Sequence, residues 1–568
     1  MRASAPPLRP LEIAALALGS AAIAAVMHWP LPLHLGRDVS RDVGDPLVQA
    51  WQVAWGGHAL LHQPLDYFQA NTFWPLRNTL AFSEALVGYA PAGVVGDGVY
   101  AAIVRYNLLF LFAYALAFVG AYLLARELGV GRGAAAVGGA AFAYAPWRLE
   151  QDGHLHVLSS GGIPLCLFLL VRGYRANSAW TVLGAWLVAT WQLSLGFTLG
   201  LQLAYLLAAL ALVAVVFWVR SRPPLGRATL VATLAGVTLF AGTAVLLARP
   251  YMQVLDDHPE AHRTRAQIAG LSPPLRAFIA APEENLVWGK ATAGVRDDLS
   301  SVPEQTLFPG VVIVSLALAG ALGGIYAKRL RGALALAVLV FAVLSLGAPE
   351  HGSPFLHPYR LLYDFAPGWK GIRAPGRLTT LTSLALALLA AAGAQRGLHY
   401  AEGRSGLRFL RVVPSGAIGA LFVIAILAEG SGFDLGGGGR SVSGPSHPAV
   451  PKPPPGQLGL PSPQLHLPMT IPANRRYVLW STEGFPKIVN GRGSFVPKSF
   501  AQLTGQMVRF PDAATLARLR AIHVQLVVLH PNLARGTPWE GTELRRARAP
   551  GLRQSARDGV IVYELSSR

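Results

Sequence analysis

The stretch FTLGLQLAYLLAALALVAVVFWV, residues 197–219, decides the fold because it contains no charged side chain. About 20 apolar residues in a helix cross the roughly 30 Å of hydrocarbon in a bilayer, so this stretch predicts a transmembrane helix. The composition of the whole chain agrees. Of its 568 residues, 52% are hydrophobic and 14% are charged, whereas soluble proteins carry about 25% charged residues. We therefore expect lipid to surround much of this protein.

Ten further apolar blocks predict membrane spans, which gives an all-α polytopic domain of about eleven transmembrane helices. The first block has no clear cleavage site after it, so we expect an uncleaved anchor rather than a signal peptide. The predicted spans are 11–27, 108–125, 133–147, 157–171, 179–195, 197–219, 228–248, 307–326, 332–347, 378–394 and 412–429.

A twelfth apolar block, 86–104, is predicted not to span, because it contains Pro91, Asp97 and several glycines. When this block is not counted as a span, the face that holds the N-terminus carries 16 basic and three acidic residues. This asymmetry is the positive-inside pattern, so we expect a membrane protein with a cytoplasmic N-terminus and an extracytoplasmic C-terminus. The formal net charge of +19 then follows from orientation and a basic tail, and no nucleic-acid partner is needed.

The predicted domains follow from these spans. Residues 1–429 form the membrane domain, whose outer loops include 28–107 and 249–306, and 430–475 form a Gly- and Pro-rich linker that contains Gly436–Gly439. Residues 476–568 form a small extracytoplasmic α/β domain. Its predicted elements are strands at Tyr477–Trp480, Val524–Leu529 and Val560–Leu565 and a helix at Ala513–Ile522 that follows Asp512.

The first outer loop places Asp42 and Asp45 shortly after the first span. Pro46 suits the first turn of a helix over 47–62, which we expect to lie in the membrane interface with Trp51 and Trp55 at headgroup depth. Asp45 has two readings that are compatible with each other. It is the N-cap of this helix, or it is a general base at the membrane surface.

Further polar residues lie in the outer loops, and we take them as candidates for substrate binding or catalysis. A carboxylate such as Glu84, just before an apolar stretch, requires a partner or a water-filled cavity. The His-x-His pair is a weak metal signal, so hydrogen bonding to a polar substrate is favoured and a divalent cation stays an open alternative. The candidates are Asn71, Glu84, Arg148, Asp152, His154, His156, Glu304, Arg373 and Arg377.

Arg373 and Arg377 are basic residues on the outer face, which runs against the positive-inside bias. One explanation is an anionic ligand such as a lipid-linked phosphate, which arginine binds bidentately. Pairing with lipid headgroups or with Asp364 is the alternative.

The layout resembles the GT-C glycosyltransferases, and in particular a group of bacterial glycosyltransferase-like membrane proteins. The resemblance covers nearly the whole chain through short motifs. These are Gly44-Asp45-Pro46, Asn71–Pro75, Arg148 with Gly153-His154, Glu304 with Phe308-Pro309-Gly310, Pro367-Gly368 with Arg373–Arg377, and Ile488–Gly491 with Phe495–Pro497.

The resemblance implies an enzyme of cell-envelope polysaccharide assembly, which transfers a sugar from a polyprenyl-phosphate donor to an extracytoplasmic glycan or lipid. The first-loop acid of the GT-C pattern falls on Asp45, with Asp42 as the fallback, and a second-loop acid falls on Asp152. The alternative is a non-catalytic protein that binds or flips a lipid-linked sugar, or a scaffold. Charge-free span interiors favour the enzyme, because transporters need ionisable groups near the midplane. Membrane lipid is an expected partner, and the oligomeric state is left open.

Overall fold

The structure is a computed structural model that describes residues 7–221, 225–349, 357–403, 415–432, 442, 444–544 and 552–565. Two parts of the sequence predictions lie outside the described residues. These are Gly436–Gly439 of the predicted linker and the basic residues Arg404, Arg408 and Arg411 of the last predicted cytoplasmic loop.

The chain divides into two compact units, which we call unit 1 and unit 2. Unit 1 consists of residues 1–33, 109–246 and 263–447, and unit 2 consists of 34–108, 247–262 and 448–568. This division follows packing and differs from the expected boundaries at 429 and 475. The first outer loop belongs to unit 2 together with the C-terminal segment, although the two are far apart in the sequence.

Each of the eleven predicted spans overlaps one of the longer helices of the described residues, and the last span is described from residue 415 onwards. Two spans are interrupted, because 133–147 crosses a break in the helix at 144–145 and 157–171 crosses one at 159–161. Six helical segments are long and apolar enough to cross a membrane, which makes this a multi-pass membrane protein. The helices are α1 (Pro10–Met27), α4 (Gly98–Glu127), α5 (Arg132–Ala143), α8 (Gly162–Ala176), α9 (Ala179–Leu195), α10 (Phe197–Ser221), α11 (Arg227–Asp257), α15 (Val311–Gly323), α16 (Lys328–Ser345), α18 (Thr379–Gly403) and α19 (Ser415–Gly430). The block 86–104 forms no single helix, because it is divided between α3 (Ala90–Gly93) and the start of α4.

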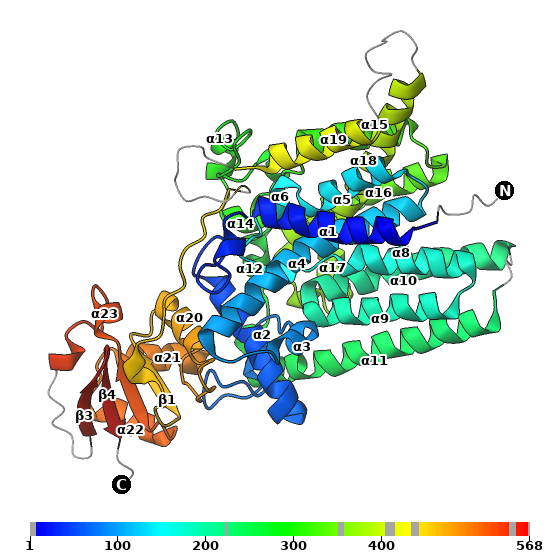
Figure 1. The fold of residues 1–568 in the computed structure, drawn as a ribbon. Helices are drawn as coiled ribbons and strands as arrows, with labels where there is room; N and C mark the ends of the chain where they lie inside the picture. The colour runs from blue at the N-terminus through cyan, green and yellow to red at the C-terminus, as the bar shows by residue number, and fades with distance from the viewer. Residues whose placement is uncertain are drawn as a thin grey trace. The chain divides into compact units, whose positions relative to one another are not determined.

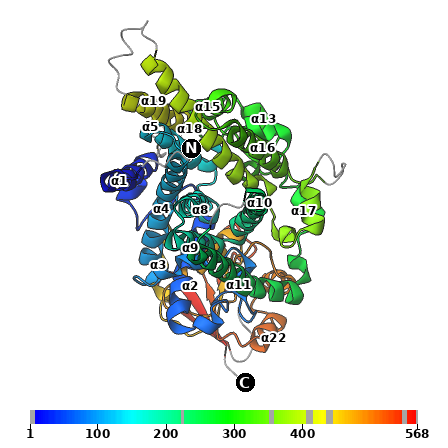
Figure 2. The same cartoon turned by 90° about the vertical axis from the view of Figure 1, so that its right-hand side faces the viewer.

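Helix α18 lies at the centre of unit 1, where it packs against α5, α15 and α16 (Figure 2). Close packing requires small residues at the contact. A Cβ on Gly393 of α18 would lie 2.0 Å from the carbonyl oxygen of Leu316, and a Cβ on Gly320 of α15 would lie 2.0 Å from that of Leu389. These two glycines therefore let α15 and α18 approach backbone to backbone.

Charged residues from the predicted cytoplasmic loops gather at one end of unit 1. Arg126 and Arg132 pair with the buried Glu12 at 2.8 and 2.9 Å. Arg172 and Arg175 pair with Glu127 at 3.3 and 3.1 Å. The first helix and two of the loops that the charge pattern assigned to one face thus meet in space.

Unit 1 also contains short helices that connect the long ones at their other ends. They are α6 (Pro146–Leu149), α7 (Leu155–Leu158), α12 (Arg265–Ala269), α13 (Ala293–Asp297), α14 (Val302–Gln305), α17 (Tyr359–Phe365) and the 3₁₀ turn η8 (Pro375–Leu378). The loop 148–156 lies against α14, because the Gln151 side chain donates a hydrogen bond to the Pro303 carbonyl.

Unit 2 contains a four-stranded sheet in the order β1-β2-β4-β3 (Figure 1). Strands β1 and β2 are parallel, with Gln464 opposite Leu526, and the other two pairs are antiparallel. The strands are β1 (Gln464–Leu467), β2 (Leu526–Leu529), β3 (Leu552–Arg557) and β4 (Val560–Leu565). The longer helices that lie entirely in unit 2 are α2 (Asp45–His62), α20 (Ile471–Trp480), α21 (Lys498–Met507) and α22 (Ala513–Ala521), and the short ones are α3 and α23 (Pro531–Ala534).

The tail predictions hold in part. Strands β2 and β4 and helix α22 are where the sequence placed them, and Asp512 caps α22 by accepting the Thr515 amide at 2.8 Å. The predicted strand at Tyr477–Trp480 is wrong, because these residues end α20. The Thr470 side chain caps that helix, and Pro472 lies in its first turn. The predicted linker also contains β1.

Helix α2 corrects the prediction that its tryptophans lie at headgroup depth. Trp51 and Trp55 are both only 3% exposed. Their Nε1 groups donate to Asn71 Oδ1 and to the Tyr67 carbonyl, each at 3.0 Å. The tryptophans therefore belong to the core of unit 2, and the apolar spacing that suggested lipid contact reflects burial in protein.

Candidate functional site

Asp45 is the first residue of α2, and Gly44 precedes it as the N-cap. The reading of Asp45 as the side-chain cap is therefore wrong. Asp42 accepts the Gly44 amide at 2.6 Å and so shapes the turn before the helix. The Asp45 carboxylate lies at the positive end of the helix dipole, which favours a negative charge.

The partner of Asp45 is Arg475 of α20, a residue that sequence analysis missed. Arg475 Nη2 lies 3.0 Å from Asp45 Oδ1. The approach depends on Gly44, since a Cβ there would lie 3.1 Å from Arg475 Nη1 and 2.4 Å from Asp42 Oδ1. The side chains of Asp45 and Arg475 are 42% and 25% exposed, so a ligand can reach this ion pair from solvent.

The other candidates of unit 2 are more enclosed. Asn71 is buried and engaged at both ends of its amide, because it accepts from Trp51 and donates to the Pro486 carbonyl at 2.9 Å. Glu84 is half-buried and lies in the electrostatic reach of Tyr251. The contacts of Asn71 hold the first outer loop against the C-terminal segment within unit 2.

Unit 1 brings together Glu304, Arg377 and His156. Arg377 donates to both Glu304 oxygens, at 2.5 Å from Nη2 and 3.1 Å from Nε, in a bidentate pair. Its Nη1 lies 3.0 Å from His156 Nε2. Because a guanidinium can only donate, His156 accepts this bond through an unprotonated Nε2. Glu304 and Arg377 are only 7% and 10% exposed.

The Glu304 carboxylate is held as an anion despite its burial. Burial alone would raise its pKa, but the charges of Arg377, His154 and Arg373 lower the pKa to about 2. His154 itself contacts Gln151 Oε1 at 3.0 Å. This cluster fastens α14 to η8 and to the loop 148–156.

Arg148 and Asp152 lie deeper, and neither is exposed. Arg148 donates to Ser160 Oγ at 2.7 Å and to the Leu158 carbonyl, and its guanidinium lies over the Tyr114 ring. Tyr114 in turn donates to Asp152, which also lies 3.5 Å from His28. Burial lowers the pKa of His28 well below its usual range. These side chains therefore form a closed network with no direct access for a substrate.

Arg373 is exposed, in contrast to Arg377. It lies close enough to Arg263 for the two positive charges to oppose each other. Burial, and then the charge of Arg373, lower the pKa of Arg263. Two arginines that repel each other favour an anion between or beside them.

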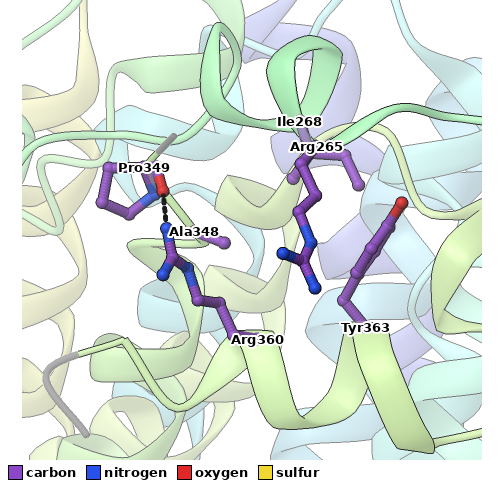
Figure 3. Close-up of a pocket in the computed structure, with 6 residues that line it drawn as sticks. All are labelled: Arg265, Ile268, Ala348, Pro349, Arg360 and Tyr363. Atoms are coloured by element: carbon purple, nitrogen blue, oxygen red, sulfur yellow. Dashed lines mark hydrogen bonds between the residues drawn. The ribbon is translucent and has the colours of Figure 1, made fainter. Parts of the chain in front are cut away.

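A shallow hollow with an empty volume of about 230 Å³ lies on the same part of unit 1 (Figure 3). Arg265 and Arg360 line it together with Tyr363, whose hydroxyl donates to the Arg263 carbonyl at 2.8 Å. Both lining arginines already have partners. Arg265 pairs with Asp364 at 2.7 Å, and Arg360 donates to the Pro349 carbonyl at 2.5 Å.

Among the residues that the structure describes, no group of three His, Cys, Asp or Glu side chains is placed to share a metal ion. His154 and His156 stack edge to face, with ring centroids 5.8 Å apart.

Comparison with solved structures relates the chain to known membrane enzymes. It matches all of its length to a cryo-EM structure of the arabinofuranosyltransferase AftD from Mycobacteria, with a TM-score of 0.53 and 16% sequence identity. This chain spans 42% of AftD.

More distant likenesses cover 97% of the chain. They are to the oligosaccharyltransferase AglB from Archaeoglobus fulgidus with a dolichol-phosphate (TM-score 0.44, 14% identity, 74% of AglB) and to ArnT from Cupriavidus metallidurans (0.34, 13%, 97% of ArnT). No family model matches the sequence, and no curated protein matches it.

Proposed function

Because this chain has the fold of the GT-C glycosyltransferases, we propose that it is a membrane glycosyltransferase. In this proposal it transfers a sugar from a polyprenyl-phosphate donor to an acceptor hydroxyl outside the cytoplasm. The acceptor is a glycan or lipid of the cell envelope. The fold alone does not specify a reaction, so the proposal depends on the side chains.

The observation that carries the proposal is the exposed Asp45 carboxylate and its ion pair with Arg475. As the acceptor oxygen attacks the anomeric carbon, Asp45 takes the hydroxyl proton. The bond between the anomeric carbon and the phosphate oxygen breaks, and the polyprenyl phosphate leaves. A general base of this kind contributes about 10²–10⁴-fold to the rate. Arg475 orients the carboxylate through the ion pair, and is therefore a positioning residue.

Arg373 is the residue that we assign to the donor phosphate. It is exposed, and its charge is opposed by Arg263, so the negative charge of the donor phosphodiester, and then of the phosphate monoester that leaves, relieves this repulsion. Arg377 has the same charge, but its guanidinium is committed to Glu304 and His156. We therefore assign Arg377, Glu304, His154, His156, Arg148 and Asp152 to holding the outer loops of unit 1 in place.

The proposal includes the orientation that the charge pattern predicts. Residues 126–132 and 396–411 are cytoplasmic, and residues 249–306 and the C-terminal segment are outside. Impermeant thiol labels would test it, because the native Cys166 is buried. Cysteines introduced at 128 and 290 should be labelled from the inside and the outside, respectively.

The decisive experiment uses the full chain in nanodiscs with a pool of polyprenyl-phosphate-linked sugars prepared from bacterial membranes. We expect lipid-linked sugar to co-purify with the protein and to be consumed when cell-envelope glycans are added, with release of polyprenyl phosphate measured by mass spectrometry. Binding without consumption would favour a non-catalytic carrier or scaffold. Co-purification of phospholipid alone, with no consumption, would contradict the proposal.

A further inference from the structure

Residues 486–491, which we call the clasp segment, lie between the first outer loop and β1 in unit 2. The side that faces the first outer loop forms three backbone hydrogen bonds with residues 71–74. They join the Phe73 amide to the Asn490 carbonyl at 3.0 Å, the Trp74 amide to the Ile488 carbonyl at 3.0 Å and the Ile488 amide to the Asn71 carbonyl at 2.7 Å. On the other side, the Val489 amide donates to the Gln464 carbonyl of β1 at 2.8 Å. The clasp segment therefore ties the first outer loop to the C-terminal sheet.

Asn490 is completely buried in the clasp segment and uses both polar atoms of its side chain. Its Oδ1 accepts the His466 amide of β1 at 2.6 Å. Its Nδ2 donates to the His466 carbonyl at 2.9 Å and to Asn474 Oδ1 of α20 at 2.8 Å. Leaving such groups unpaired in a protein interior is costly. The Asn490 amide therefore holds α20 at one place against β1.

The clasp segment is attached to both helices that carry the exposed ion pair. Arg475 follows Asn474 directly in α20. On the other side, α2 begins at Asp45, and its Trp51 donates to Asn71 Oδ1 at 3.0 Å. The Asn71 Nδ2 in turn donates to a carbonyl of the clasp segment at 2.9 Å. Because an exposed ion pair is too weak to fix its own geometry, these buried amides set the distance between the two charges.

We propose that Asn490 is a positioning residue for the Asp45 carboxylate. It acts through α20, because its bond to Asn474 places Arg475, and Arg475 orients Asp45. The inference rests on the proposed function, in which Asp45 takes the proton of the acceptor. A displacement of about 1 Å that starts far from the reacting atoms can cost about 100-fold in rate. Loss of the Asn490 amide should therefore appear in turnover more than in donor binding.

The test compares Asn490→Ala with Val562→Ala in the full chain in nanodiscs. Val562 of β4 is completely buried, and its apolar cluster consists of Leu460 and residues of β2 and β4. Val562→Ala therefore loosens the sheet without removing a bond to α20. Asn474→Ala is a second variant, which removes the bond to α20 and keeps both bonds between Asn490 and His466. It carries the same expectations if Asn490→Ala does not fold.

Hydrogen exchange without substrate tests the contacts whether or not sugar is transferred. We expect Asn490→Ala to speed exchange in α20 by about tenfold or more and to leave α22 unchanged, because only α20 loses its attachment. Val562→Ala should change exchange in α20 by less than about twofold. Unchanged exchange in α20, or an equal change in both variants, would overturn the proposal.

Turnover is then measured as release of polyprenyl phosphate. We expect Asn490→Ala to lower turnover about tenfold, with the apparent KM for the donor changed less than about twofold. Val562→Ala should leave both near the wild-type values per folded protein. In the Arg475→Gln background Asn490→Ala should have no further effect, because both act through one carboxylate.

Two results would overturn the positioning role while the proposed function stands. One is normal turnover in Asn490→Ala although exchange in α20 has increased. The other is a loss that multiplies with the loss in Arg475→Gln, since the two residues would then act separately. Absence of transfer by the wild type would instead overturn the proposed function, and the positioning role with it.

Discussion

The Glu304–Arg377 pair of unit 1 and the Asp45–Arg475 pair of unit 2 have the same chemistry and different exposure. In the first pair both side chains are at most 10% exposed, and Arg377 contacts both carboxylate oxygens. In the second pair one contact joins side chains that are 42% and 25% exposed. A buried pair is costly to break and closed to substrate, whereas an exposed pair contributes little stability and leaves its carboxylate accessible.

The largest expected effect comes from breaking the buried pair. Arg377→Met leaves Glu304 buried without its cation, which should cost about 3–5 kcal/mol in the free energy of unfolding. Denaturant titration of the protein in micelles measures this loss. The double variant Glu304→Leu/Arg377→Met should regain most of it, because apolar replacement of a buried pair is close to neutral. If Arg377→Met lowers the free energy of unfolding no more than Arg475→Gln does, the two ion pairs do not differ in the way described here.

Asp45→Asn should reduce sugar transfer by about 100-fold or more, while the free energy of unfolding changes by about 1 kcal/mol or less. The amide keeps the shape of the side chain but cannot take a proton. Asp558→Asn is the matched control, since Asp558 is an exposed carboxylate of the same unit. The quantity to measure is the rate of polyprenyl phosphate release. Near-normal release by Asp45→Asn would exclude Asp45 as the base.

Arg475→Gln should lower turnover about tenfold to 100-fold with little change in the apparent KM for the donor, because Arg475 acts through Asp45. Arg475→Lys should restore part of the activity. Arg476→Gln removes the same charge from the adjacent residue of α20 and should be nearly neutral. In the Asp45→Asn background the Arg475 substitution should have no further effect on turnover. Additive losses would show that the two residues act separately.

Between pH 6.5 and 4.5, acid should weaken unit 2 more than unit 1. Burial also lowers the pKa of His28 in unit 1, but unit 2 has two such histidines in contact with each other. In unit 2, His466 and His530 are buried and lie 3.0 Å apart. Burial lowers the pKa of His466 to about 3, and burial together with His466 lowers the pKa of His530 well below its usual value. Their unfolded forms bind protons below pH 6.5, so stability is present above pH 6.5 and is lost as the pH falls towards 3. The slope is about 1.4 kcal/mol for each histidine and pH unit.

The contribution of Glu304 to stability is lost over a lower pH range. Its lowered pKa stabilises the fold above about pH 4.5, and this contribution is lost between pH 4.5 and about 2. Hydrogen exchange at pH 7, 5.5 and 4.5 should therefore show a larger loss of protection around β1 and β2 than around α14. His466→Gln should reduce the loss around β1 and β2. Equal loss at these two places at pH 5.5 would contradict this difference.

The smallest effect concerns Arg373, which lies two residues before η8. Arg373→Lys should weaken donor use about tenfold, because lysine keeps the charge but loses the bidentate geometry. Acceptor dependence should be unchanged. Arg360→Lys, at the neighbouring hollow, is the control. If donor dependence is the same in Arg373→Lys as in the wild type, the phosphate site must be sought elsewhere.

The sequence predicted the helices of unit 1 well, because a span is a local property of about 20 apolar residues. It did not predict β1, whose four residues lie in a Pro-rich stretch and depend on pairing with β2. The sequence also led to a wrong position for Trp51 and Trp55. The same helical spacing of apolar residues occurs in helices that contact lipid and in helices that pack in a protein core. Thr470 and Pro472 are a local signal for the start of α20. This signal outweighs the strand character of the last residues of the helix.

For the candidate site, the sequence placed Glu304, Arg377 and His156 on one predicted face, and unit 1 brings these three into contact. The ion pair of Asp45 had no local signal, because Arg475 follows 430 positions later in a segment expected to be linker. The sequence also could not show that Arg148 and Asp152 are fully enclosed, because their enclosure depends on contacts with Tyr114 and His28, which come from other segments of the chain.

The separation of Asp45 from Arg475 also sets a sequence of events during synthesis. Asp45 is made before α4, and its arginine is made after α19, the last of the apolar helices. Every apolar helix from α4 to α19 is therefore translated while the carboxylate lacks this partner, and the ion pair closes only on a nearly complete chain. A polypeptide that stops anywhere before residue 475 has the acid without its guanidinium.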